Sequence, residues 1–335
     1  MNKKLIYGAL AVFAFGVAAY ANISHATPNG TPVLMYHEFV TDSVATPPGD
    51  TVITVTKFNQ QMSWLKRNGY CSMQVSQLIN YMTNTGRVTI ANQAESFMVR
   101  PTKCKPVVLT FDDGWNNQQN ALPGLRNNGF TATFFIIGTY PDSNNSSYMN
   151  WNKINTLVRS GHEIGSHTMT HPYNMLLSDA TYEVATSKTY IASKTGQQIV
   201  SLAWPGGYYT ADLLNFAETV AKYKGTLSVD DNWCYSSNIS LEGTPYCDWH
   251  TGNYVGDDEF KIKRIFVDGR CSIAEFGTIV NQGHTMACIG DGTKNMEAPG
   301  IMRVPVDPYS SYGASIPRDA VEPSNTGDEY LWRTR

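Results

Sequence analysis

The sequence lacks an excess of charge of either sign. It has 25 Lys and Arg residues against 28 Asp and Glu residues in 335 positions, which gives a formal net charge of −3. No basic run follows the N-terminus, so the charge pattern offers no basis for binding a polyanion. Nucleic acid is therefore not an expected partner.

Long apolar runs are also missing, except at the N-terminus. Residues 5–19 form an apolar stretch after Lys3 and Lys4, and Ala19-Tyr20-Ala21 is a small-x-small cleavage pattern. We expect a signal peptide over residues 1–21, cleaved after residue 21 or, at a second such pattern, after residue 26. The product would be a secreted or periplasmic protein without a stable membrane span. An uncleaved anchor is the alternative, because the stretch is close to the lower length limit for crossing a bilayer.

No pair of cysteines has the C-x-x-C spacing, which removes the usual sequence sign of zinc fingers and of thioredoxin-like chemistry. The six cysteines are an even set in a chain that we expect to be exported, so disulfides are the expected use. Free buried thiols are the alternative. The sequence alone does not choose among the pairings. Our working hypothesis joins Cys71 with Cys104, Cys234 with Cys247, and Cys271 with Cys288.

Short apolar strands alternate with helical segments through most of the chain. The apolar run 31–40 predicts a first strand that ends near Tyr36-His37, and the other expected strands cover residues 105–110, 130–137, 162–166, 201–204, 226–229 and 262–267. The expected helices cover residues 56–68 (capped by Thr56), 75–82, 121–128, 151–160, 178–194 (capped by Ser178), 211–222 and 272–281. Residues 83–104 look like an irregular surface insertion, and residues 296–335 like a Pro/Ser/Tyr-rich tail.

This alternation predicts an α/β fold with parallel βα units in one domain over residues 30–290. Polar groups at strand ends match the rule that α/β barrels carry their sites at the carboxyl ends of the strands. A doubly wound sheet is the competing architecture, but no Gly-rich phosphate loop follows any strand.

Two adjacent carboxylates stand at the end of one expected strand. Thr110-Phe111-Asp112-Asp113-Gly114 directly follows the apolar run Val107-Val108-Leu109. Like charges this close raise each other's pKa, and desolvation adds to the cost. Such a pair usually serves a cation or a reaction.

Two histidines follow further along the chain, in Ser166-His167-Thr168-Met169-Thr170-His171. Two imidazoles and one carboxylate are a common ligand set for a catalytic metal that keeps an open coordination position. One aspartate of the pair is then free to act on the metal's water. The alternative is an Asp-Asp turn with two unrelated surface histidines.

Both motifs together, in this order and on strand ends, resemble those of the polysaccharide deacetylases, also called carbohydrate esterase family four or the NodB-homology domain. The resemblance covers residues 33–280 and implies a distorted (β/α) barrel. It implies Asp112 as the general base and Asp113, His167 and His171 as ligands of a divalent metal, most often Zn²⁺. A divalent ion acidifies water and polarises an amide carbonyl, and a carboxylate beside it can accept the proton.

The resemblance also implies a general acid. Most of the family uses a histidine near the C-terminal end of the domain. The subgroup that acts on poly-β-1,6-N-acetylglucosamine has it in an N-terminal motif, which Val33-Leu34-Met35-Tyr36-His37 matches. The run from Arg264 to Gly269 resembles the closing segment of that subgroup. His37 is therefore expected to protonate the leaving amine. His284 is the rival, and a purely structural role for His37 is the plain alternative.

The run Trp204-Pro205-Gly206-Gly207 stands in the place of the family's third motif, with two departures. Ala203 occupies a position where many members have an arginine paired with the base, which leaves the tuning of Asp112 unexplained. Gly206 replaces a usual tyrosine. Glycine keeps the backbone N–H that helps to hold the oxyanion but loses the ring, and one of the two tyrosines that follow could compensate.

Trp233 matches the groove tryptophan of the family's fourth motif, although a core tryptophan is equally common. The leading hypothesis is a secreted, metal-dependent N-deacetylase acting on N-acetylhexosamine residues of a polysaccharide. An amidase acting on peptidoglycan, chitin fragments or a lipid-linked sugar is one alternative. A carbohydrate-binding protein that has lost turnover is the other, and the Gly206 departure is its only support.

Overall fold

The structure is a computed structural model, and it describes residues 30–43, 51–83, 88–90, 97–99, 104–229, 253 and 256–283. The expected signal peptide, the expected tail, Trp233 and His284 lie outside these residues. Within the described part of the chain, no helix combines the length and the apolarity needed to cross a membrane.

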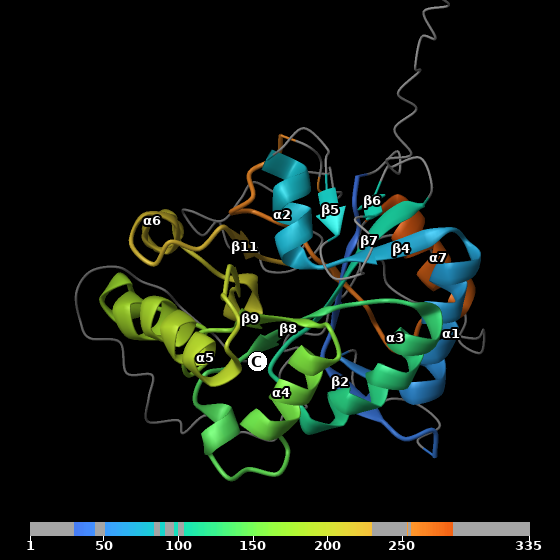
Figure 1. Ribbon diagram of the computed structural model, residues 1–335, viewed down its shortest axis with the longest axis horizontal. Coiled ribbons are helices and arrows are strands. Elements are labelled where there is room, and N and C mark those ends of the chain that lie inside the picture. Colours follow the sequence, from blue (N-terminus) through green and yellow to red (C-terminus); the bar gives the residue numbers. More distant parts are fainter. Residues whose placement is uncertain are drawn as a thin grey trace, which may run out of the picture.

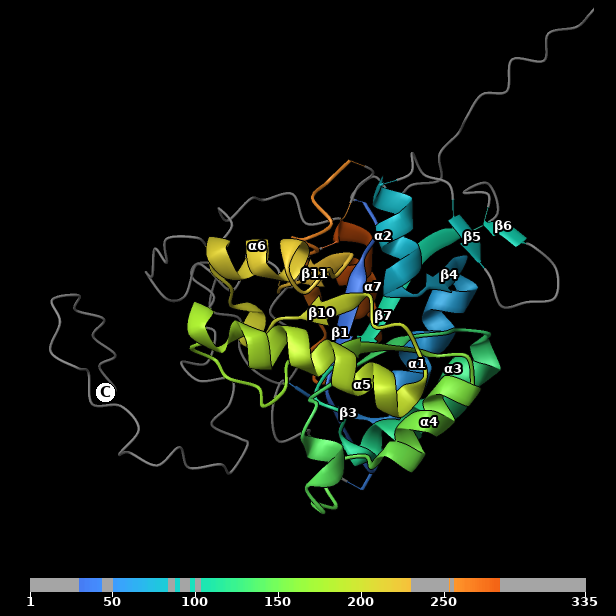
Figure 2. The same cartoon turned by 60° about the vertical axis from the view of Figure 1, so that its left-hand side comes forward.

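One curled parallel sheet organises the chain (Figures 1 and 2). Its strand order is β11-β10-β9-β8-β7-β1-β12, with β4 alongside the first half of β7. The strands are β1 (Val33–Tyr36), β4 (Tyr70–Met73), β7 (Lys105–Phe111), β8 (Thr133–Ile136), β9 (Glu163–Ser166), β10 (Ser201–Ala203), β11 (Gly225–Leu227) and β12 (Ile265–Phe266).

The segment 259–266 joins the two ends of this strand order. Its first part bonds to β11, since Thr226 N–H donates to the Glu259 carbonyl (3.0 Å) and Ile262 N–H donates to the Thr226 carbonyl (3.1 Å). Its last part is β12, which pairs with β1. The sheet thus closes on itself, which confirms the expected distorted (β/α) barrel. The doubly wound alternative is wrong.

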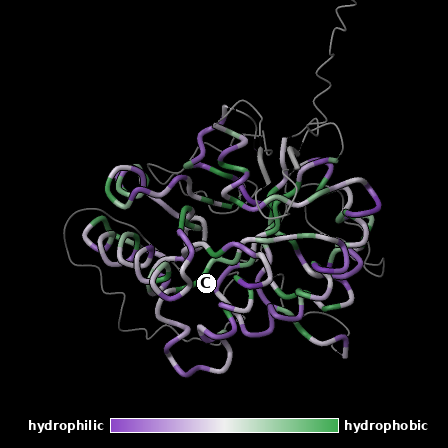
Figure 3. The backbone as a smooth tube through the Cα atoms, viewed as in Figure 1, coloured by the Kyte–Doolittle hydropathy of each residue, from purple (hydrophilic) through white to green (hydrophobic). Residues whose placement is uncertain are grey.

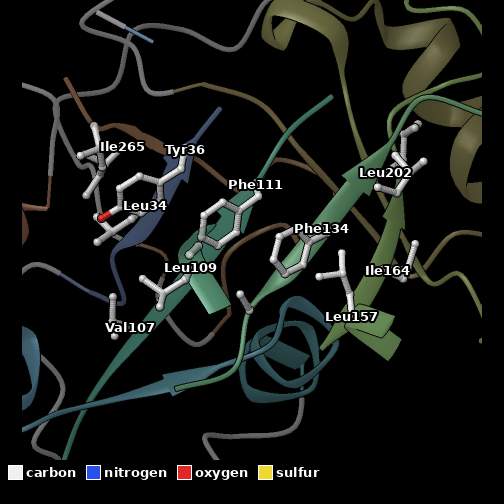
Figure 4. Packing of buried hydrophobic residues seen from close by; sticks show 14 of the residues in the cluster. Leu34, Tyr36, Val107, Leu109, Phe111, Phe134, Leu157, Ile164, Leu202 and Ile265 are labelled. Atoms are coloured by element: carbon white, nitrogen blue, oxygen red, sulfur yellow. The ribbon is translucent and has the colours of Figure 1, made fainter. Parts of the chain in front are cut away.

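Apolar side chains from neighbouring strands fill the main core (Figure 4). Leu34, Leu109, Phe134 and Leu202 are fully buried, and the rings of Phe111 and Phe134 stack at 4.6 Å. Each such side chain stabilises the fold by about 2 kcal/mol through removal from water. The backbone coloured by hydropathy shows the same pattern, with apolar residues concentrated along the central strands (Figure 3).

Helices cover the outside of the sheet. They are α1 (Val55–Arg67), α2 (Val75–Thr83), α3 (Leu122–Asn128), α4 (Trp151–Arg159), α5 (Ser187–Thr195), α6 (Ala211–Thr219) and α7 (Ile273–Gln282). In Figure 1, α1, α3 and α7 gather on the right of the sheet and α5 and α6 on the left. The expected helix positions are thus largely confirmed.

Two expected helix starts are wrong. Helix α1 is capped by Thr54, whose hydroxyl accepts from the Lys57 N–H, whereas Thr56 lies inside the first turn and its hydroxyl donates to Asp42. The expected helix 178–194 divides into a short 3-10 turn (Leu177–Asp179), a π-helical turn (Thr181–Thr186) and α5. Ser178 lies inside the 3-10 turn and caps nothing.

The first strand ends near Tyr36-His37 as expected, since β1 ends at Tyr36. The rest of that apolar run contains β2 (Glu38–Val40), which leaves the main sheet to pair with β3 (Val52–Thr54). Residues 83–104 are not wholly irregular, since β5 (Val88–Ile90) and β6 (Phe97–Val99) pair there as antiparallel strands.

The disulfide Cys71–Cys104 is present, with its Cα atoms 5.8 Å apart, so this predicted pairing is confirmed. Cys271 is disulfide-bonded as well. The predicted partner of Cys271, Cys288, lies outside the described residues, and so does the predicted pair Cys234–Cys247.

Replacing Glu163 by glutamine is expected to flatten the pH dependence of stability. Glu163 opens β9 at the end remote from His167 and accepts hydrogen bonds from the backbone N–H (3.2 Å) and the hydroxyl of Ser76. Burial outweighs these bonds and raises the pKa of Glu163 from 4.5 to about 7. Since the folded state binds this proton more tightly than the unfolded state, stability falls as the pH rises through this window, by about 3 kcal/mol.

Urea unfolding of both proteins between about pH 4.5 and about pH 7.5 measures this effect. Burial lowers the pKa of the neighbouring His162 to about 4, which works in the opposite direction. Because His162 is present in both proteins, its contribution cancels in their difference. Stability curves that stay parallel across the window would show that Glu163 does not titrate there.

Candidate functional site

The predicted site residues meet at the carboxyl ends of the parallel strands. His37 follows β1, the aspartate pair follows β7 and His167 follows β9. A cleft opens there. Its lining consists of Met35, His37, Thr51, Asp112, Asp113, His167, His171, Gly206, Gly207, Val229, Arg264 and Phe266. All five residues predicted to act in catalysis or metal binding therefore share one cleft.

Asp113, His167 and His171 have the spacing of metal ligands. Asp113 Oδ1 lies 3.4 Å from His167 Nε2 and 3.5 Å from His171 Nε2, and the two nitrogens are 3.2 Å apart. Ligands at about 2.0–2.1 Å from a tetrahedral ion are separated by about 3.3 Å. The three atoms also lie within 4.8 Å of one another. Donor types and spacing both fit a tetrahedral divalent metal.

The pKa values of the two imidazoles are shifted in opposite directions. His167 Nδ1 lies 2.8 Å from the Ala203 carbonyl, which only accepts, so this nitrogen donates and Nε2 keeps its lone pair for a metal. Burial lowers the pKa of His167, but Asp112 and Asp113 outweigh it and the net shift is upward. Burial and the charge of His167 lower the pKa of His171 to about 4. Metal ligation requires both rings to be neutral, so the affinity for metal is expected to decrease as the pH is lowered.

A strained turn presents Asp113. Its φ is 74°, and Gly114 follows at 77°, so a non-glycine residue occupies the left-handed region directly before a glycine that adopts it freely. Trp115 Nε1 donates to Asp113 Oδ2 at 2.9 Å. This bond occupies one carboxylate oxygen and leaves Oδ1 facing the histidines. Strain of this kind is typical of functional turns.

Asp112 has a buried cationic partner. Arg264 Nη1 donates to Asp112 Oδ1 at 2.7 Å, and Arg264 Nε donates to the Ser228 carbonyl at 3.0 Å. The two side chains are 1% and 2% exposed. Burial alone would raise the pKa of Asp112, but the charges of Arg264, His167 and His37 outweigh it and hold this pKa below its ordinary value. The tuning that Ala203 left unexplained therefore comes from Arg264, which lies in the segment that closes the barrel.

Gln118 ties the strand ends that carry Asp112 and His37. The pairing of β1 with β7 extends to a bond from Asp112 N–H to the Tyr36 carbonyl. Just beyond it, Gln118 Nε2 donates to the carbonyls of His37 (2.8 Å) and Asp112 (2.5 Å). Gln118 is fully buried. One side-chain amide thus continues the ladder where the two strands part.

His37 faces this cleft from the break between β1 and β2. It is 8% exposed, and its ring lies 6.0 Å from that of Phe266. Burial lowers the pKa of His37, and the charges of Asp113 and Asp112 oppose that shift. The ring shares the cleft with Asp112.

The third-motif residues divide between cleft and core. Gly206 lines the cleft with φ 61°, and a Cβ on it would meet the Tyr208 ring at 2.9 Å. The backbone conformation therefore favours glycine here, and the ring of Tyr208 occupies the adjoining space. Trp204 and Pro205 are buried and do not line the cleft.

Sequence reasoning missed the partners of the predicted residues. Arg264 was visible only as part of a resembling segment, and Trp115 directly follows the aspartate motif. Nothing in the sequence marked Gln118 or the Ala203 carbonyl, because their roles depend on which strand ends lie side by side.

Comparisons with known proteins point to polysaccharide deacetylases. The family model described as polysaccharide deacetylase matches residues 99–223. The chain is 27% identical over 201 residues to YxkH, a polysaccharide deacetylase-type protein of Bacillus subtilis, covering 59% of this chain and 64% of that protein. It is 36% identical over 115 residues to a chitooligosaccharide deacetylase of Bradyrhizobium, covering 33% and 50%. The aligned region thus spans less than two thirds of either relative.

A solved structure shows the same fold. The deacetylase PplD of Streptococcus pyogenes, determined in complex with acetate, superposes with a TM-score of 0.56 over 74% of this chain and 96% of that chain. The two sequences are 19% identical. This likeness concerns the fold alone.

Proposed function

Because the chain belongs to the polysaccharide deacetylase family, we propose that it is a secreted, metal-dependent N-deacetylase that removes acetyl groups from N-acetylhexosamine residues of a polysaccharide. The observation that carries the proposal is that the two adjacent aspartates have different environments. Asp113 has the spacing of a metal ligand beside two histidines, whereas Asp112 is held by Arg264 within the same cleft.

The metal is expected to be Zn²⁺, held by Asp113, His167 and His171. When bound, it supplies a Lewis acid that polarises the acetamide carbonyl and acidifies water. Asp112 accepts the proton of the attacking water, and its lowered pKa keeps it ionised for this role at neutral pH. The backbone N–H of Gly206 offers a donor to the developing oxyanion.

His37 acts as the general acid. The attack of water on the acetyl carbon gives a tetrahedral intermediate. Its C–N bond breaks as the nitrogen takes a proton from the imidazolium form of His37, a form that the charges of Asp113 and Asp112 favour, and the products are a free amine, acetate and neutral His37. The position of His37 in the cleft that also contains Asp112 supports this assignment. The unused side chains Met35, Val229 and Phe266 give the cleft an apolar part that suits an acetyl methyl group.

Export to an oxidising compartment is part of the proposal. The disulfide Cys71–Cys104 and the oxidised state of Cys271 support it, since structural disulfides persist mainly outside the cytosol.

Acetate release from a panel of substrates tests the proposal. The panel holds β-1,6-linked N-acetylglucosamine oligomers, chitin oligomers and peptidoglycan. We expect acetate from at least one of them, loss of that activity after chelation, and recovery when Zn²⁺ is restored. A protein that binds no divalent ion, or that releases no acetate from any member, would contradict the proposal and leave a binding role.

His37→Ala is expected to lower turnover by about 10²–10⁴-fold, because the leaving amine loses its proton donor. Metal affinity should stay unchanged, since His37 is not among the three ligands. His284→Ala is the matched control and should retain turnover. The reverse pattern would assign the acid to His284.

A further inference from the structure

The loop that carries the two histidines is conformationally strained. Thr168 and His171 have φ values of 64° and 68°, two of the five positive values found among described non-glycine residues. Each such residue costs of order 1 kcal/mol or more and persists only where surrounding contacts impose it. The His171 N–H donates to Thr168 Oγ1 at 3.0 Å, so the loop folds back on itself.

One side of this loop is fixed by the turn after β8. Gly138 N–H donates to the Thr168 carbonyl, and Thr139 N–H donates to the Met169 carbonyl, both at 3.0 Å. Gly138 also packs closely against Met169, since a Cβ there would lie 2.6 Å from Met169 Sδ.

The other side of the loop is held by Glu183. Its Oε2 accepts from the backbone N–H groups of Met169 (3.0 Å) and Thr170 (2.8 Å), and its Oε1 accepts from the Thr170 hydroxyl (2.6 Å). The residue is 6% exposed. No ion pair formed within the described residues includes Glu183. Its carboxylate therefore meets its desolvation cost through hydrogen bonds to the loop.

The element that carries Glu183 is unusual. The π-helical turn Thr181–Thr186 follows the short 3-10 turn, and Glu183 and Val184 are its buried members. Such turns are rare, and they frequently mark functional positions because they change the direction in which side chains project. This turn interrupts the regular α-helical pattern expected over residues 178–194.

We propose that Glu183 is a positioning residue, whose carboxylate holds the histidine loop in the conformation that binds the metal. The inference rests on the metal site of the proposed function. Glu183 touches no candidate ligand atom, and its bonds go to the two backbone groups and the hydroxyl between His167 and His171. Its removal should change metal affinity and coordination more than the fold.

The test compares Glu183→Gln with the wild type in metal binding, using Zn²⁺ in competition with a chromogenic chelator and the visible spectrum of bound Co²⁺. Glutamine has nearly the same shape, but it has one acceptor oxygen in place of two and no charge. We expect Zn²⁺ to bind about 10–100-fold more weakly, with an altered Co²⁺ spectrum. Glu163→Gln is the matched control, because it makes the same change at a buried carboxylate at the far end of β9, and it should bind Zn²⁺ like the wild type.

Thr170→Val is a second variant in case Glu183→Gln fails to fold. It removes only the hydroxyl that bonds to Glu183 and should weaken Zn²⁺ binding a few-fold. If Glu183→Gln and Thr170→Val both folded and bound Zn²⁺ as tightly as the wild type, the positioning role of Glu183 would be overturned and the proposed function would not be affected. Absence of metal from the wild type would overturn the proposed function along with it. Metal binding without acetate release would remove the proposed function while the role of Glu183 stands.

Discussion

Asp112→Asn is expected to abolish acetate release while the protein keeps its metal. Asparagine is nearly isosteric with aspartate and still accepts a hydrogen bond from Arg264, but it cannot take a proton from water. The loss of the general base should lower turnover by about 10³-fold or more. Since Asp112 is not among the three clustered ligands, Zn²⁺ affinity should change little.

Acetate release and Zn²⁺ content, measured on the same preparations, separate these effects. Asp113→Asn is the matched control one residue away, and it should lose metal as well as activity. If Asp112→Asn retained turnover, the base would have to be another group. If it lost metal, the division of the pair would be wrong.

Arg264→Met is expected to damage both stability and turnover. Methionine fills much of the volume but leaves the buried carboxylate of Asp112 without its cation. Breaking a buried ion pair at one partner costs about 3–5 kcal/mol. The pKa of Asp112 should also rise, because burial would then act without its main opposing charge. The acid limb of the pH–rate profile should move to higher pH.

The sign of the accompanying stability change follows from the lowered pKa of Asp112. A carboxylate whose pKa is lowered in the folded state stabilises the protein above its ordinary pKa, and this contribution is lost as the pH falls through the folded-state value. Arg264→Met should therefore lose most stability near neutral pH and least in strong acid. Urea unfolding across this range measures the difference.

A double-mutant cycle isolates the pair. In Asp112→Asn/Arg264→Met no buried carboxylate is left unpaired, so the double variant should be less destabilised than the sum of the two single changes. Arg264→Lys keeps the charge but loses the guanidinium group, which bonds to Asp112 and to the Ser228 carbonyl at the same time. Its stability and turnover should therefore lie between those of Arg264→Met and the wild type. Additive energies would show that Arg264 and Asp112 do not interact.

The elements that sequence reasoning located are those with strong local signals. Buried parallel strands read as short apolar runs, and the expected strands before Asp112 and His167 ended within one residue of the ends of β7 and β9. Since carboxyl ends of parallel strands meet on one face, the order of the strands and motifs along the chain was enough to assign the aspartate and histidine motifs to one site.

The parts that escaped prediction depend on contacts distant in sequence. Arg264 pairs with Asp112 across 152 positions, and only the closure of the barrel brings them together. The helix expected over residues 178–194 contains a π-helical turn that carries Glu183, and the bonds of Glu183 to the histidine loop are tertiary contacts that local propensity does not contain. Gly206 looked like a defect in a motif, whereas its positive φ makes glycine the suitable residue.

The closing segment 259–266 has a consequence for the order in which activity arises. The proposed acid is at the start of the domain, next to β1, and the cation that tunes the base is near its end, next to β12, and these two strands are neighbours in the sheet. A chain synthesised only as far as residue 250 already contains both carboxylates and both imidazoles. It lacks Arg264, so its base has no buried cation and its barrel has no closing strand. Hydrolytic competence should therefore appear late in synthesis, when the last strand is inserted beside the first.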